Sequence, residues 1–126
     1  MENISHLAPI FAVRDMDSSL AFYKKIGFQI GFLWQTPPTY AVLSAGELAS
    51  VHLSLLDPEH HDRPVKSILY VFVHDVDQIY ALCQTEKLNI LTPIGDRDYQ
   101  MRDFELEDPD GHVLVFGKNL DHSESK

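Results

Sequence analysis

The chain has 126 residues, of which 44% are hydrophobic, and a formal net charge of −9. This length and composition suit a single domain with one core. The excess of carboxylates argues against a nucleic-acid partner, because binding to phosphates needs a basic surface, and no stretch approaches the ~20 apolar residues that span a bilayer.

The chain contains one cysteine, Cys83, so no disulfide can form within it. A lone cysteine is typical of a reducing compartment. The first residues also lack the basic start and apolar run of a signal peptide. We therefore expect a cytoplasmic protein, with Cys83 as a buried, inert thiol on an apolar helix face.

The first elements of the chain occur twice, at a constant offset of sixty residues (75 − 15 = 60). Residues 8–17 and 68–77 each read as a strand that leads into the start of a helix. An internal repeat of this kind predicts two similar halves, with a functional cleft where they meet. The matched pairs are Val13/Val73, Asp15/Asp75, Asp17/Asp77, Ala21/Ala81 and Ile30/Ile90.

The first half reads as strand, helix and three strands. The apolar run 7–13 predicts a strand buried on both faces. Asp15 or Asp17 then caps a helix that ends at Gly27, where a left-handed residue is needed. Strands follow at 28–34, 40–43 and 48–55, separated by the break at Pro37-Pro38 and the turn 45–47.

The second half repeats this order after the polar, proline-bounded segment 57–66. A strand at 68–73 precedes a helix whose apolar residues recur with helical spacing from Val76 to Cys83. Strands follow at 89–91, 100–107 and 112–116. In the strand 100–107, Phe104 and Leu106 alternate with Asp103, Glu105 and Glu107, which predicts a buried face and a solvated face.

Several motifs resemble the vicinal oxygen chelate superfamily, which is also called the glyoxalase/bleomycin resistance/extradiol dioxygenase superfamily. They are Val13-Arg14-Asp15, Ser19 to Tyr23, Ile26-Gly27-Phe28, Met101 to Phe104 and Asp108 to His112. The resemblance implies an α+β fold in which two βαβββ modules curl their sheets around a shared cleft. We predict one domain over 1–118, with module one at about 5–56, the polar segment 57–66 as a linker and module two at 67–118. Because the last residues have no apolar anchor, we expect a flexible tail at 119–126.

Enzymes of this superfamily hold a divalent metal with one side chain from each of four strands. The resemblance places those positions at Ala8, His52, Ile68 and Val115, of which only His52 can coordinate a metal. A metal site needs at least three converging N, O or S ligands. We therefore expect no metal and no other cofactor.

The chain consequently resembles the metal-free branch, the bleomycin resistance proteins, which sequester a bulky, cationic, aromatic drug without reacting with it. Those proteins form homodimers by exchanging the N-terminal strand, with a proline near the hinge. Pro9 lies at the matching place, so the resemblance implies the same exchange here.

The candidate ligand-binding residues are mainly aromatic. A stacking surface for a flat ligand and ordinary core packing both explain aromatic residues on strands, but Trp34 and Tyr99 adjoin polar, strand-breaking sequence typical of a cleft rim. Side chains alternate along a strand, so His52 lies on the opposite face from Val51 and Leu53. The hypotheses for His52 are a base, a hydrogen-bond donor to a ligand, a metal-site remnant or a structural histidine. The full set is Phe32, Trp34, Tyr40, His52, Tyr99, Arg102 and Phe104; Arg102 either binds an acidic ligand group or pairs with a nearby carboxylate.

We therefore predict a metal-independent protein that binds a hydrophobic or aromatic small molecule, with antibiotic resistance by sequestration as the concrete version. Cationic ligands suit the net charge of −9, although acidity also keeps small domains soluble. The alternative is a metal-dependent lyase or dioxygenase with atypical ligands around His52 and Glu47 or Glu107. A third hypothesis is a domain that acts only as a structural or regulatory partner.

Overall fold

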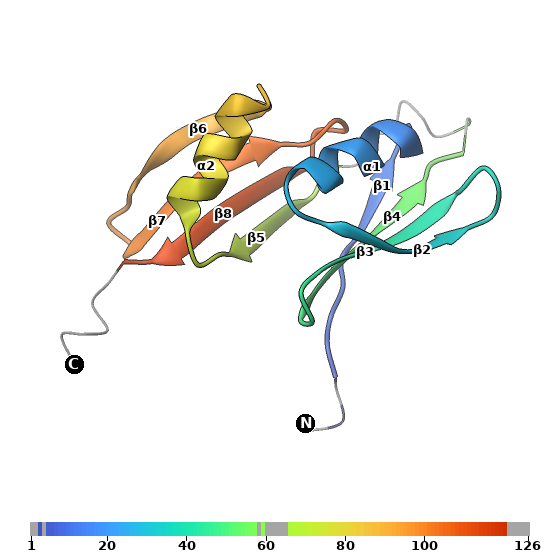
Figure 1. The fold of residues 1–126 in the computed structure, drawn as a ribbon, viewed down its shortest axis with the longest axis horizontal. Helices are drawn as coiled ribbons and strands as arrows, with labels where there is room; N and C mark the ends of the chain where they lie inside the picture. Colours follow the sequence, from blue (N-terminus) through green and yellow to red (C-terminus); the bar gives the residue numbers. More distant parts are fainter. Residues whose placement is uncertain (1–2, 4, 58, 60–65, 121–126) are drawn as a thin grey trace. The chain divides into compact units, whose positions relative to one another are not determined.

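The computed structural model describes residue 3, residues 5–57, residue 59 and residues 66–120. The chain divides into two compact units, residues 1–65 and 66–126, and each contains one helix and one four-stranded sheet. The α+β class and the two βαβββ modules are therefore confirmed (Figure 1). Most of the predicted linker and tail lies outside the described residues.

The first unit contains the sheet that we call sheet 1. The elements in chain order are β1 (Ile10–Val13), α1 (Met16–Lys25), β2 (Gln29–Trp34), β3 (Tyr40–Ala45) and β4 (Ala49–Leu55). Strand β1 pairs with β4 in parallel, and the other pairings are antiparallel, so the strand order is β1-β4-β3-β2.

Helix α1 covers one face of sheet 1 (Figure 1). Asp15 directly precedes the helix, and Gly27 follows it with φ of +109°, a conformation that side chains rarely adopt. Leu20, Tyr23 and Ile26, which lie about one helical turn apart, are all buried. The ring of Tyr23 packs against three phenylalanine rings, which form the centre of this core: Phe11, Phe22 and Phe28.

The predicted burial of residues 7–13 on both faces is wrong. Phe11 and Val13 are buried under α1, whereas Leu7 and Ile10 are exposed. The reason is that β1 is an edge strand of a sheet that carries a helix on only one side, so its side chains alternate between core and surface.

The second unit repeats the arrangement in sheet 2. The elements are β5 (Ile68–Phe72), α2 (Val76–Thr85), β6 (Asn89–Asp96), β7 (Met101–Glu107) and β8 (Val113–Asn119). Strand β5 pairs with β8 in parallel, and the strand order is β5-β8-β7-β6.

Helix α2 covers one face of sheet 2 in the same way (Figure 1). Asp75 caps it by accepting a hydrogen bond from the backbone N–H of Gln78. Cys83 is buried on its inner face, as predicted. No helix among the described residues is long and apolar enough to cross a membrane.

The sixty-residue repeat extends to a feature that the sequence does not reveal. The helices occupy residues 16–25 and 76–85, and the pairing register slips by one residue at Gly31 in β2 and at Leu91 in β6. Both positions follow the first paired residues of their strands. A β-bulge turns the following side chains to the other face of the sheet, so both halves use it to set which residues face away from the helix.

Candidate ligand-binding site

The face of sheet 1 opposite α1 carries most of the predicted ligand-binding residues. Residues that pair directly across neighbouring strands point to the same side of a sheet. Trp34 pairs with Tyr40, Phe32 with Val42, and Val42 with His52. We call this side the open face of sheet 1, and its residues include Ile10, Phe32, Trp34, Tyr40, Val42 and His52.

The bulge at Gly31 places two of these aromatic residues there. Ile30 pairs with Leu43, which points to the helix side, whereas Phe32 pairs with Val42. In an unbroken register, Phe32 would instead pair with Ala41, a residue that is fully buried under α1. The bulge therefore turns Phe32 and Trp34 away from the core.

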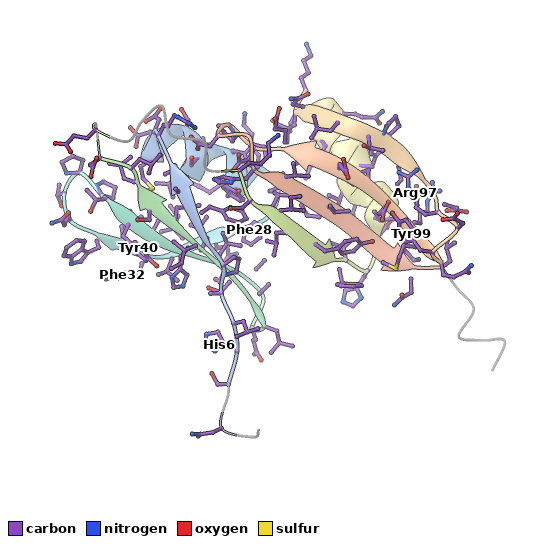
Figure 2. All side chains as sticks on the ribbon, turned by 180° about the vertical axis from the view of Figure 1, so that it is seen from behind. His6, Phe28, Phe32, Tyr40, Arg97 and Tyr99 are labelled. Atoms are coloured by element: carbon purple, nitrogen blue, oxygen red, sulfur yellow. The ribbon has the colours of Figure 1, made fainter. Side chains whose placement is uncertain are left out.

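These side chains remain accessible. Phe32 and Trp34 are each 54% exposed, while Tyr40 and His52 are half-buried. The Tyr40 hydroxyl lies 2.6 Å from Nδ1 of His52, and the two rings are nearly perpendicular with centroids 5.5 Å apart. Figure 2 shows Phe32 and Tyr40 on this sheet. As the alternation predicts, His52 lies opposite the buried Val51 and Leu53.

Sheet 2 also has a face opposite its helix, and a polar cluster occupies it. Asp103 pairs with Gly117 of β8 and with Gly95 of β6, so no neighbouring side chain flanks it on either strand. A Cβ atom on Gly117 would overlap the Tyr70 hydroxyl, and one on Gly95 would lie 3.1 Å from Nη1 of Arg97. The two glycines therefore make room for the groups that bind Asp103.

Three side chains donate hydrogen bonds to the Asp103 carboxylate. Nε of Arg97 donates to Oδ1 at 2.8 Å, and the hydroxyls of Tyr70 and Tyr99 donate to Oδ2 at 2.9 Å and 2.8 Å. Nη2 of Arg97 also donates to the carbonyl oxygens of Asp103 and Pro93. We call Asp103, Arg97, Tyr70 and Tyr99 the Asp103 cluster; Figure 2 shows Arg97 and Tyr99 close together in it.

The cluster keeps Asp103 ionised although it is only 2% exposed. Burial alone would raise the pKa of this carboxyl, but the hydrogen bonds from Arg97, Tyr99 and Tyr70 outweigh it, so the pKa lies below its ordinary value. Burial and the bond to Asp103 raise the pKa of Tyr70. The bond to Asp103 likewise raises the pKa of Tyr99, so both phenols stay protonated at neutral pH.

The prediction that Asp103 lies on a solvated strand face is wrong. Side chains along β7 alternate between faces as predicted. The face that Asp103 shares with Glu105 is only partly exposed, however, because Tyr70, Tyr99 and Arg97 cover the Asp103 carboxylate. Tyr70, Arg97 and the two glycines were not among the residues predicted from the sequence. What identifies these residues is that a glycine lies beside Asp103 on each neighbouring strand. This arrangement can be recognised only when the strand pairing is known.

The two remaining predicted residues, Phe104 and Arg102, do not share a face of sheet 2 with Tyr99. Both point to the α2 side. Phe104 is fully buried between the rings of Tyr80 and Phe116. Arg102 donates hydrogen bonds to Asp77 of α2 at 2.8 Å and to Asp96 of β6 at 2.9 Å. Pairing with nearby carboxylates is one of the two roles predicted for it.

A separate cavity of about 210 Å³ lies in the first unit, at the start of α1. Its lining contains none of the predicted ligand-binding residues. It combines polar side chains with a proline pair, one methionine and one leucine: Arg14, Asp15, Met16, Asp17, Pro37, Pro38, Thr39 and Leu55.

The residues at the four metal positions do not fit a metal. Ala8, Ile68 and Val115 are aliphatic and have no lone pair to donate from their side chains. His52 carries the one imidazole in this set, and its Nδ1 is engaged by Tyr40. Within the described part of the chain, no group of three or more His, Cys, Asp or Glu side chains could hold a metal ion. Glu47 is exposed, and Glu107 accepts a hydrogen bond from the amide of Asn89.

Known structures share this fold along almost the whole chain. A bleomycin-binding protein in complex with bleomycin is 24% identical, with a TM-score of 0.71, and the match covers 92% of this chain and 99% of that one. A bleomycin resistance determinant encoded on transposon Tn5 is 23% identical, with a TM-score of 0.73 and coverage of 92% and 98%. A superfamily member from Sphaerobacter thermophilus DSM 20745 is 20% identical, with a TM-score of 0.77 and coverage of 94% and 100%.

These likenesses establish the fold. No curated protein matches the chain at a significant level. The model of the Glyoxalase/Bleomycin resistance protein/Dioxygenase superfamily matches residues 3–116, which is most of the sequence. The chain therefore belongs to the Glyoxalase/Bleomycin resistance protein/Dioxygenase superfamily.

Proposed function

We propose that this protein binds and sequesters a hydrophobic or aromatic small molecule on the open face of sheet 1, without a metal and without chemical conversion. A bleomycin-type glycopeptide is the concrete candidate, which would make the protein an antibiotic resistance determinant. The cleft shared by both modules, which the family resemblance implies, remains a prediction.

The observation that carries this proposal is the pair Phe32 and Trp34, each 54% exposed on one sheet face. Exposing two large aromatic side chains side by side is unfavourable in water, and contiguous exposed apolar groups mark binding surfaces. Flat rings also stack well on such side chains, with about 0.5–1.5 kcal/mol per pair beyond the buried area. A bulge that turns both residues outward supports a role other than core packing.

Tyr40 and His52 add polar groups beside this aromatic surface. Their hydrogen bond fixes the orientation of both rings, so the imidazole and the phenol can contact a ligand without first being ordered. A site with aromatic walls and a few fixed polar groups is typical of small-molecule binding. The net charge of −9 favours a cationic ligand.

Two solved relatives support the candidate ligand. Both are described as binding, or conferring resistance to, bleomycin. Identity of 23–24% is too low to transfer a ligand. The choice of bleomycin as a probe rests on these relatives, whereas the location of the site rests on the exposed aromatic residues.

Fluorescence titration tests the proposal, because Trp34 is the only tryptophan. The probes are a bleomycin-type glycopeptide, an uncharged flat aromatic compound and a non-aromatic cation. We expect the glycopeptide to quench Trp34 with saturation at one ligand per chain. Absence of quenching by both aromatic probes, in protein that circular dichroism shows to be folded, would refute binding at this face.

A Tyr40→Phe variant separates stacking from polar recognition. It keeps the ring and removes the hydrogen bond to His52. We expect the uncharged aromatic probe to bind it as tightly as it binds the wild type. A large loss for that probe would show that the polar pair, and not the aromatic surface, dominates binding.

The competing hypothesis is a metal-dependent lyase or dioxygenase. Metal analysis of protein purified without chelators distinguishes the two, with His52→Gln as the matched variant. We expect no stoichiometric divalent ion in either protein. A stoichiometric ion that His52→Gln loses, together with an activity that the ion restores, would replace the binding function with an enzymatic one.

We also propose that the protein is a homodimer with an exchanged N-terminal strand. Pro9 lies directly before β1, and its carbonyl accepts a hydrogen bond from the backbone N–H of His52. An exchanged β1 would make the same pairing with β4 of the partner. Light scattering at micromolar protein concentration should give the mass of a dimer, and a monomer mass would contradict this proposal.

A further inference from the structure

His112 is a fully buried histidine that the proposed function does not use. It lies in the turn between β7 and β8 and directly precedes β8. A buried polar side chain is stable only when hydrogen bonds replace its contacts with water. The bonds of His112 therefore show what this histidine holds in place.

The backbone of His112 closes a tight turn with Asp108. The N–H of Asp108 donates to the carbonyl of His112, and the N–H of His112 donates to Oδ1 of Asp108, both at 2.9 Å. The same Oδ1 accepts the N–H of Asp110 at 2.9 Å, and Gly111 adopts the positive φ that the turn requires. These bonds fix the backbone from which the imidazole projects.

The imidazole of His112 accepts a hydrogen bond from the backbone of Ser67. The amide nitrogen of Ser67 lies 3.0 Å from Nδ1 of His112, and the carbonyl of Ser67 accepts the N–H of Val113 at 2.8 Å. Ser67 directly precedes β5 and directly follows the predicted linker 57–66. These two bonds therefore fasten the point at which the chain enters the second unit, and we call the pair Ser67 and His112 the Ser67 latch.

The bond to Ser67 determines where the imidazole carries its proton. A backbone N–H can only donate, so Nδ1 of His112 must offer a lone pair, and the proton of the neutral ring is on Nε2. A second proton, on Nδ1, would turn the acceptor into a donor that faces another donor. The imidazolium form of His112 and the bond to Ser67 therefore exclude each other.

Titratable groups of several segments surround the latch. Asp108 is buried in the same turn as His112, and its negative charge lowers the cost of a buried imidazolium. Strand β5 contributes Tyr70, whose hydroxyl donates to Asp103. The others lie in the turn, at the end of β7, before Ser67 and at the end of α2: Asp110, Glu107, Lys66, Glu86 and Lys87.

We propose that the Ser67 latch is a pH-sensitive device: neutral His112 holds Ser67 at the start of β5, and protonation of His112 releases it. Imidazole is the side chain that ordinarily changes its charge between pH 5 and 8. Release frees the N–H of Ser67 and loosens the point at which the segment 57–66 joins the second unit. The latch lies within the second unit, so it does not depend on ligand binding at the open face of sheet 1.

Nuclear magnetic resonance of the ¹⁵N-labelled full chain at pH 8 and pH 5 tests the latch in the wild type. At pH 8 we expect an unprotonated Nδ1 of His112 that couples, across the hydrogen bond, to the amide nitrogen of Ser67. At pH 5 this coupling should disappear, and the protection of the Ser67 amide against hydrogen exchange should fall about tenfold, since one hydrogen bond is lost. Protection is measured relative to an unstructured peptide at the same pH.

The amide of Val73 is the internal control. It lies directly after the other end of β5 and donates to the carbonyl of Gly117 in β8. Its protection should be the same at pH 8 and pH 5, because release of Ser67 leaves the pairing of β5 with β8 in place.

Two substitutions separate the hydrogen-bond acceptor from the proton. In His112→Asn the amide oxygen takes the position of Nδ1, so it accepts from Ser67 but does not titrate. The protection of the Ser67 amide should then be equal at pH 8 and pH 5. His112→Leu keeps an apolar side chain at the site without an acceptor, so this protection should be low at both pH values.

A protonated Nδ1 at pH 8 would overturn the proposal, as would a coupling to Ser67 that persists at pH 5. Equal losses of protection at Ser67 and Val73 would also overturn it, because they would show unfolding of the sheet and not release of one residue. A pH-dependent protection of Ser67 that remains in His112→Asn would assign the effect to another group. The wild-type measurements decide the question even if neither variant folds.

Discussion

Replacing Gly117 with alanine tests whether the Asp103 cluster is built as described. In most strands Gly→Ala is favourable by about 0.5–1 kcal/mol, because alanine loses less backbone entropy on folding. At Gly117 the added Cβ would lie 2.8 Å from Cβ of Asp103 and 2.9 Å from Cζ of Tyr70, besides overlapping the Tyr70 hydroxyl. The first of these neighbours is close to the backbone and cannot move away freely.

The expected cost follows from these contacts. Displacing Tyr70 removes a hydrogen bond to an ionised group, which is worth about 1.5–3 kcal/mol, and overpacking adds about 1–3 kcal/mol. Allowing for the gain in backbone entropy, we expect Gly117→Ala to lower the free energy of unfolding by about 2–4 kcal/mol.

Urea denaturation followed by circular dichroism measures this cost as a lower midpoint at an unchanged m-value. Gly95→Ala is the matched control, because its Cβ would approach only the far end of the flexible Arg97 side chain, at 3.1 Å. We expect Gly95→Ala to change the stability by much less than Gly117→Ala does.

A double-mutant cycle with Tyr70→Phe identifies the clash. Removing the hydroxyl takes away the atom that the new Cβ overlaps, so Gly117→Ala should cost less in the Tyr70→Phe background, by about 1 kcal/mol or more. If Gly117→Ala were as stable as the wild type, or cost the same in both backgrounds, the described packing around Asp103 would be refuted.

Three further predictions concern Asp103, Cys83 and Arg102. The pKa of Asp103 lies below its ordinary value, so the stability that the ionised carboxylate contributes is present above that ordinary value and is lost as pH falls through the folded-state pKa. The urea midpoints of the wild type and of Asp103→Asn should therefore converge on acidification. A difference between them that stays constant with pH would contradict this. Burial raises the pKa of Cys83 to about 11, so at pH 8 the thiol should react with Ellman's reagent only when the protein unfolds. Rapid reaction in the native protein would instead show an accessible thiol. Arg102→Gln removes two ion pairs with exposed carboxylates, so it should lower the free energy of unfolding by at most about 1 kcal/mol. It should also leave the affinity for bleomycin unchanged. A clear loss of affinity would show that Arg102 belongs to the binding site.

The repeated order of elements follows directly from local sequence. Asp75 caps the start of α2 through its side chain and Gly27 follows the end of α1 with a positive φ, and both effects act without tertiary contacts. Asp15 precedes α1 but makes no side-chain capping bond, so the predicted cap is not formed there. The alternation of β7 and the position of His52 also follow from the period of two in a strand. These parts of the fold can be predicted because each depends on a few neighbouring residues.

The faces of the sheets depend on pairing, which the sequence does not state. The bulge at Gly31 reverses the direction of Phe32 and Trp34. A glycine within a strand often marks a bulge, but the residue alone does not state the pairing that sets which face the following side chains take. The sequence also predicted a solvated Asp103, because the partners that bury it lie outside β7, in β5 and in the turn between β6 and β7. Those partners can be identified only when Gly95 and Gly117 are known to flank it.

The most direct test of the proposed function is calorimetric titration of bleomycin into the wild type and three alanine variants of adjacent residues. Phe32→Ala and Trp34→Ala remove the two exposed aromatic residues of the open face of sheet 1, whereas Leu33→Ala alters the residue between them, which pairs with Ala41 and points to the helix side. The account predicts that each aromatic variant weakens binding about tenfold or more and that Leu33→Ala binds like the wild type. Equal affinity in all four proteins, or a loss confined to Leu33→Ala, would contradict the placement of the ligand on this face.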